Sequence, residues 1–110
     1  MSARMMTRRE MNSEVTLYSE VAKVNRATIQ VEILDRELDE LLLRYHRACE
    51  RQQVSFRNSL KIRHDVLVET RDQYNKYIMD KKEQIRLMLT LNHVDATIPF
   101  IQRMVEGLHL

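Results

Sequence analysis

Residues 27–48 decide the fold, and they read ATIQVEILDRELDELLLRYHRA. Seven apolar side chains recur in this stretch at alternating steps of four and three residues: Ala27, Val31, Leu34, Leu38, Leu41, Tyr45 and Ala48. This spacing puts all seven on one stripe of an α-helix and is typical of the seam at which two helices of a coiled coil meet. The stretch therefore predicts a long helix that packs lengthwise against another helix.

A second apolar seam follows in the chain, and Lys81 interrupts it. Its members are Leu60, Leu67, Tyr74, Tyr77, Ile78, Ile85, Met88 and Leu91. Between the two seams the apolar pattern thins, and Asn58 and Ser59 are the residues there that best tolerate a turn. We therefore predict a coiled-coil helical hairpin over residues 13–93 with a bend near 57–59.

The composition supports a helical chain and excludes other classes. One Gly and one Pro in 110 residues supply too few turns for a β-sandwich or barrel, and 44% hydrophobic residues are too many for disorder. No uncharged apolar run approaches the roughly 20 residues that cross a bilayer. The predicted fold is all-α, a long helical hairpin or antiparallel coiled coil plus a short C-terminal helix.

The two ends of the chain are predicted to differ from the hairpin. Residues 1–12 are rich in Met and Arg and are expected to form a flexible basic tail, with a targeting segment as the alternative. Residues 95–107 are expected to form the short C-terminal helix. Asp95 would cap this helix, Pro99 fits its first turn and Gly107 marks its end.

Charge is arranged in blocks that favour an antiparallel partner. Residues 13–43 carry seven acidic and three basic side chains, whereas residues 44–64 carry six basic and one acidic. If the chain reverses direction at residue 58, residues equally far from it on either side face each other. This reflection about residue 58 brings opposite charges together in six pairs: Arg36 with Asp80, Asp35 with Lys81, Glu40 with Lys76, Arg44 with Asp72, Arg47 with Glu69, and Arg51 with Asp65. A hairpin and an antiparallel dimer of continuous helices satisfy this map equally.

The principal functional hypothesis is a non-enzymatic interaction or scaffold subunit. It would assemble with itself or with other helical proteins in a multiprotein complex. Such chains resemble small subunits of assemblies and short coiled-coil proteins of cytoskeletal or ciliary structures, and no motif here is specific to either. The expected partner-interface residues are Val31, Leu34, Leu38, Leu41, Tyr45, Leu67, Tyr74, Ile78 and Ile85.

The alternative hypothesis is binding of a nucleic acid or another polyanion through a basic stripe. The stripe comprises Arg44, Arg47, Arg51, Arg57 and Lys61. Asp65, Glu69 and Asp72 are positioned by the reflection to neutralise its first three members. Internal pairing is therefore the competing interpretation of these charges.

We expect neither an enzyme nor a cofactor. One Gly and one Cys exclude a Gly-rich phosphate loop, a nucleophile elbow and a paired-Cys motif. His46 and Cys49 share a helix face, but the other ligands of a zinc or haem site are missing. The single cysteine makes a reducing compartment, the cytoplasm, the simplest expectation, with the nucleus, the cytoskeleton and the cilium left open.

Overall fold

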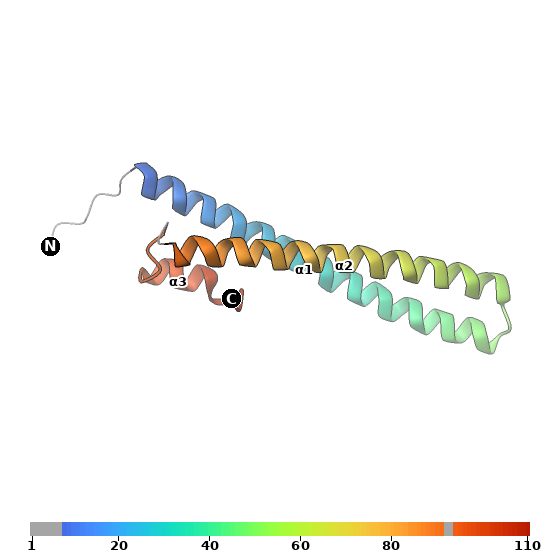
Figure 1. Cartoon of the computed structure of the whole chain (residues 1–110). Coiled ribbons are helices and arrows are strands. Elements are labelled where there is room, and N and C mark those ends of the chain that lie inside the picture. The colour runs from blue at the N-terminus through green and yellow to red at the C-terminus, as the bar shows by residue number, and fades with distance from the viewer. Residues whose placement is uncertain (1–7, 92–93) are drawn as a thin grey trace. The chain divides into compact units, whose positions relative to one another are not determined.

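The computed structural model describes residues 8–91 and 94–110, with side chains from residue 13 onward. These described residues form three helices, α1 (Arg8–Glu50), α2 (Val54–Thr90) and α3 (Pro99–Glu106) (Figure 1). No strand occurs in the described ranges. The predicted all-α class is confirmed, with a helical hairpin and a short C-terminal helix.

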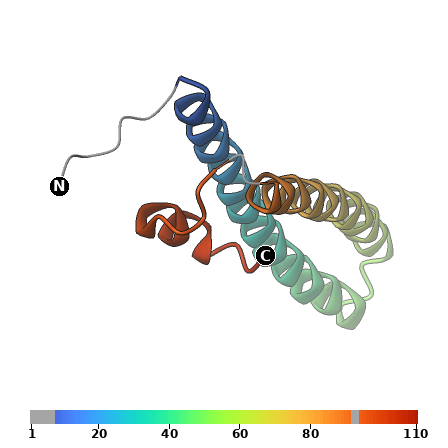
Figure 2. The ribbon, with the colours of Figure 1, turned by 60° about the vertical axis from the view of Figure 1, so that its left-hand side comes forward.

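The chain divides into two compact units. Unit 2 comprises Ala27–Tyr77, and unit 1 comprises the described residues before and after it. In unit 2 the end of α1 and the start of α2 are joined by a short connection (Figure 2, green). Leu41 and Ala48 of α1 pack there with Leu60 of α2, and Tyr45 and Leu67 lie partly buried against them. The seam over residues 27–48 therefore packs against α2 of the same chain, and the continuous helix is wrong.

The turn between α1 and α2 occupies residues 51–53 and not the predicted 57–59. The N–H of Gln53 donates to the carbonyl of Ala48 at 3.0 Å, and that of Gln52 to Cys49 at 3.2 Å. This pair of bonds is the Schellman motif, which needs a left-handed residue, and Gln52 has φ 58°. Because a glutamine takes the position at which glycine is usual, its residue type gave no turn signal.

Moving the turn changes the pairing of α1 with α2. Asn58 and Ser59 lie inside α2, where the Ser59 hydroxyl donates to the carbonyl of Ser55. Arg71 Nη1 lies 3.4 Å from Asp35 Oδ1, and Lys81 Nζ lies 2.8 Å from Glu20 Oε2. The predicted reflection about residue 58, which paired Asp35 with Lys81, is therefore wrong.

Unit 1 has a core to which all three helices contribute. Its buried members are Leu17, Val21 and Val24 of α1, Ile85 of α2, Val94, and Ile101 and Leu108 at the C-terminal end. The α3 helix begins at Pro99, four residues later than predicted, because Asp95 Oδ1 instead accepts the N–H and hydroxyl of Thr97. Apolar burial by α3 closes this core.

The N-terminal prediction is only partly within the described residues. The α1 helix begins at Arg8, so residues 8–12 are helical and do not belong to a tail. Residues 1–7 of the predicted tail lie outside the described residues.

Candidate interaction surfaces

The predicted partner-interface residues contribute to the chain's own packing. Ile85 is fully buried, and Leu34, Leu38 and Leu41 are each at most 9% exposed. The remaining members lie at intermediate exposure: Val31, Tyr45, Leu67, Tyr74 and Ile78. Ile78 packs on the core that contains Ile85, and Tyr45 and Leu67 pack on Leu41. A partner would therefore meet other side chains first.

Large apolar side chains are exposed on the outer faces of unit 2. On α2, Ile62 is 67% and Val66 is 56% exposed, and the four-residue step between them places them on one face. On α1, Ile29, Ile33 and Leu43 are likewise exposed. These residues lie off the buried seams and form part of the apolar surface that unit 2 offers to a partner, together with the exposed Leu42, Val54, Phe56 and Tyr77.

The basic residues at the turn end of unit 2 are exposed, except for the half-buried Arg57. We call Arg44, Arg47, Arg51, Arg57 and Lys61 the basic tip. Among the described residues Arg44 approaches Glu40 at 4.0 Å, and the other four make no ion pair. The prediction that acidic residues of α2 neutralise them is wrong, since Asp65 contacts His64 and Asp72 contacts Arg71.

A small groove lies between α1 and α2 in unit 2. It measures about 230 Å³ and is lined mainly by Leu41, Leu42, Tyr45, Leu60 and His64. Pockets for small-molecule ligands usually measure about 300–1,000 Å³, so this groove has room for a side chain and not for a cofactor. It adds a shallow apolar depression beside the basic tip.

His46 and Cys49, the two potential metal ligands that share a helix face, both lie exposed on α1. His46 Nε2 lies 3.1 Å from Glu50 Oε1, and Cys49 is exposed as a free thiol. In residues 13–91 and 94–110, whose side chains are described, no group of three or more His, Cys, Asp or Glu is arranged to hold a metal ion. His46 therefore interacts with a carboxylate of its own helix.

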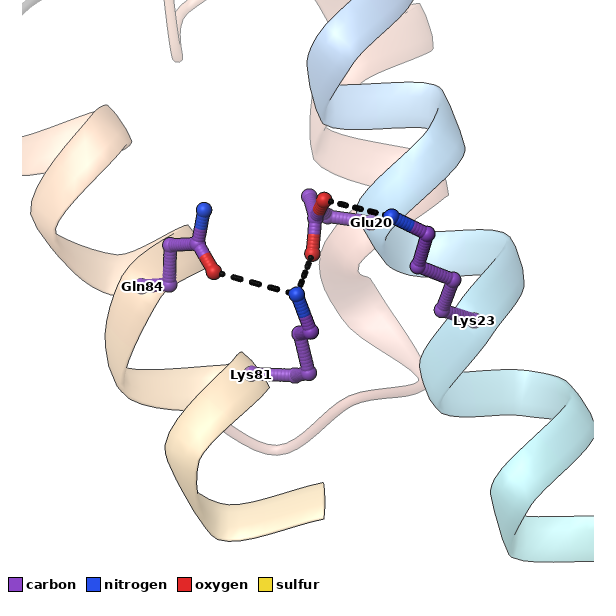
Figure 3. A network of polar contacts seen from close by, with 4 residues as sticks. All are labelled: Glu20, Lys23, Lys81 and Gln84. Carbon is purple, nitrogen blue, oxygen red and sulfur yellow. Dashed lines mark hydrogen bonds and ion pairs between the residues drawn. The ribbon is translucent and has the colours of Figure 1, made fainter. Parts of the chain in front are cut away.

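A buried ion pair lies in unit 1, and Figure 3 shows its four residues. Glu20 of α1 is 6% exposed, and its carboxylate lies 2.8 Å from Lys81 Nζ of α2. Lys23 Nζ donates to the other carboxylate oxygen at 3.1 Å, and Lys81 Nζ also donates to Gln84 Oε1 at 3.4 Å. The buried carboxylate is thus held by two lysines that each keep part of the side chain exposed.

The lysines lower the pKa of Glu20. The contact with Lys81 is the largest cause, Lys23 acts in the same direction, and burial opposes both by disfavouring the charged form. Sequence reasoning noticed Lys81 as a charge inside an apolar seam but missed Glu20. The spacing of the sequence does indicate that Glu20 is buried, because it lies between Leu17, Val21 and Val24 on the helix face that they bury.

Comparisons with protein-family models, with curated proteins and with solved structures find no match. Within the described residues, no helix combines the length and the apolar character needed to span a membrane. The fold and the surfaces together define the class, an all-α chain built on a helical hairpin with apolar and basic residues on its outer faces. Any function must be argued from these surfaces.

Proposed function

We propose that the chain is a non-enzymatic interaction module that assembles with helical proteins, other copies of itself included, as a subunit of a larger complex. One observation carries the proposal. The core of unit 2 is closed by its own two helices, while Ile62 and Val66 are left exposed side by side on α2. A hairpin that still shows such a pair has an apolar face available for another helix.

The gain from covering this pair is sizeable. Full burial of a Val or Ile side chain contributes about 1.5–3 kcal/mol, and these two retain more than half of their exposure. Covering both would contribute roughly 2 kcal/mol, a useful part of a protein–protein association. The hydroxyl of the neighbouring Thr70 already donates to the carbonyl of Val66, so a partner could cover it without breaking a hydrogen bond.

Site-specific photocross-linking in the native cell tests this proposal. A photoreactive phenylalanine analogue replaces Ile62 or Val66, and in a matched control it replaces Asn75, an exposed residue. Asn75 lies nine residues after Val66, a rotation of half a turn, and so faces the other way. We expect discrete protein adducts from positions 62 and 66 and none from 75. Equal labelling at all three positions would refute the proposal.

A reducing compartment, the cytoplasm, and a cytoskeletal or ciliary setting belong to the same proposal. The exposed Cys49 is the only cysteine of the chain, and it therefore has no disulfide partner within the chain. The scaffold role requires no bound cofactor and no catalytic group. The scaffold role depends on a pair of packed helices that presents side chains at fixed spacing.

A second candidate function, polyanion binding, is favoured by the basic tip. Arg47, Arg51 and Lys61 lie without an ion-pair partner in the described part of the chain. A nucleic acid would supply the missing negative charge. Binding to a labelled RNA should weaken steeply as salt rises and be lost in Arg47→Glu with Arg51→Glu. Lys76→Glu, a distant exposed position, is the matched control, and salt-independent or absent binding refutes this candidate.

A further inference from the structure

The outer face of α1 in unit 2 carries a second regular stripe. Its members recur at alternating steps of four and three residues: Ile29, Ile33, Arg36, Glu40, Leu43 and Arg47. All six are exposed, and Leu43 retains 53% of its surface. Arg36 and Glu40 each lie two residues from the buried Leu38, a rotation of about 200°, so the stripe faces away from α2. We call it the outer stripe.

The outer stripe is complementary to itself when reversed. A reflection about residue 38 places Ile33 opposite Leu43 and Arg36 opposite Glu40, and each of these pairs occurs twice in a two-fold contact. It also places Ile29 opposite Arg47, whose aliphatic stem can cover the isoleucine while its charge stays in water. No pair of like charges arises along the stripe.

We infer that a second copy of this chain docks on the outer stripe, with its α1 helix antiparallel to the first. This inference rests on the proposed function and names one partner for it. The two Arg36–Glu40 pairs set the direction, because a parallel arrangement in the same register would place Arg36 against Arg36 and Glu40 against Glu40. The two Ile33–Leu43 contacts supply the apolar burial on either side of the charges.

The charges of the stripe are available for such a contact. Arg36 makes no ion pair among the described residues. Within the described part of the chain, the ion-pair contact of Glu40 is the 4.0 Å approach to Arg44, at a site where both side chains are mostly exposed. The two Arg36–Glu40 ion pairs between the copies would therefore form without breaking a strong contact inside either chain.

The length of the outer stripe limits the area that a dimer can bury, and so its affinity. It covers 19 residues of helix, or roughly 27 Å at about 1.5 Å per residue. A single pair of helices over this length buries less than a standard protein–protein interface. We therefore expect a reversible dimer with a dissociation constant in the micromolar range at about 0.1 M salt.

Sedimentation equilibrium of the full chain and its charge variants tests the inference. Arg36→Glu places two acidic residues against each other across the two-fold axis, and Glu40→Arg places two basic residues there. Each variant alone should dimerise at least about tenfold more weakly than the natural chain. An equimolar mixture of the two should recover the dimer, and so should the double variant Arg36→Glu with Glu40→Arg.

The mixing experiment distinguishes a loss of dimerisation from a loss of folding. Both single variants also place like charges four residues apart in α1, but a change of this kind inside one chain would not be repaired by mixing. Helicity measured by circular dichroism should stay the same in all variants. Lys76→Glu, which alters an exposed charge on α2, is the control and should dimerise like the natural chain.

Three outcomes would overturn the inference. They are a chain that remains monomeric at several hundred micromolar, single variants that dimerise normally, and a mixture that does not recover. Photocross-linking at Ile62 and Val66 distinguishes this failure from failure of the proposed function. Adducts with a different protein there, together with a monomeric purified chain, would end the self-docking inference and leave the interaction module standing.

Discussion

Replacing Glu20 by Gln removes the negative charge from the buried ion pair of unit 1 and keeps the shape of the side chain. The amide oxygen of Gln can still accept one hydrogen bond, but Lys81 loses the charge that lies 2.8 Å from its ammonium group. Removing one partner of a fully buried pair costs about 3–5 kcal/mol. Lys81 keeps 22% and Lys23 keeps 38% of their side-chain exposure, so water stabilises part of the freed charge. We expect a loss of about 2 kcal/mol in the free energy of unfolding.

Urea and thermal unfolding followed by circular dichroism measure this loss. For a chain of about 100 residues, 2 kcal/mol lowers the Tm by roughly 8 °C. Glu83→Gln is the matched control, because Glu83 pairs with Arg86 on the exposed surface of α2 and its replacement should leave the free energy of unfolding nearly unchanged. Lys81→Met completes a double-mutant cycle with Glu20→Met. A coupling energy below about 0.5 kcal/mol in that cycle would refute the account of the pair.

The contribution of the Glu20–Lys81 pair to the free energy of unfolding should also depend on pH. The pKa of Glu20 is lowered in the folded chain, so between the folded value and the unfolded value of about 4.3 the unfolded state binds more protons. The stability that the pair contributes is therefore fully present above the unfolded value and is lost as the pH falls through the folded value. The difference in stability between the natural chain and Glu20→Gln should shrink over this acid range. A difference that stays constant from pH 7 to pH 2 would contradict the assignment.

Two further predictions concern the turn and the C-terminal helix. Gln52→Gly should raise the free energy of unfolding by about 1 kcal/mol, because φ 58° is strained for glutamine and free for glycine, whereas Ser59→Gly inside α2 should lower it by about 0.5 kcal/mol. Urea titration checks both, and a turn near residue 59 would reverse the two signs. Ile101→Ala should cost about 2–4 kcal/mol because Ile101 is fully buried, and Phe100→Ala, at an exposed position, should cost less than about 1 kcal/mol. Equal losses in this pair would show that α3 does not close the core of unit 1.

Hydrophobic spacing was enough to predict the helices. The seam over residues 27–48 and the second seam through Leu60 and Ile85 are both local patterns, and a helix buries such stripes wherever its partner lies. The scarcity of Gly and Pro excluded other fold classes for the same local reason. Ile29, Ile33 and Leu43 lie off the seam over residues 27–48, and the structure leaves them exposed.

The pairing of the charged side chains depended on one turn. Glutamine at position 52 adopts a conformation that its residue type disfavours, so no local signal marked the turn, and a bend assigned at Asn58 moved every cross-helix pair. The displaced register explains why the basic tip was expected to be neutralised inside the chain and is not. It also explains why the Glu20–Lys81 pair was missed, although both residues lie in apolar stripes.

The amino-acid sequence by itself determined that this protein is a set of amphipathic helices and gave most of the stripe that α1 buries over residues 27–48, whereas Tyr77 and Leu91 of the second seam are exposed. Residues three and four positions apart lie on the same face of a helix, so the sequence alone shows which side chains become neighbours there. Only the tertiary structure decided where α1 ends, which charges meet and which apolar side chains stay on the surface. Those outcomes depend on residues tens of positions apart, and a shift of the turn by six residues changes all of them at once while leaving every local pattern intact.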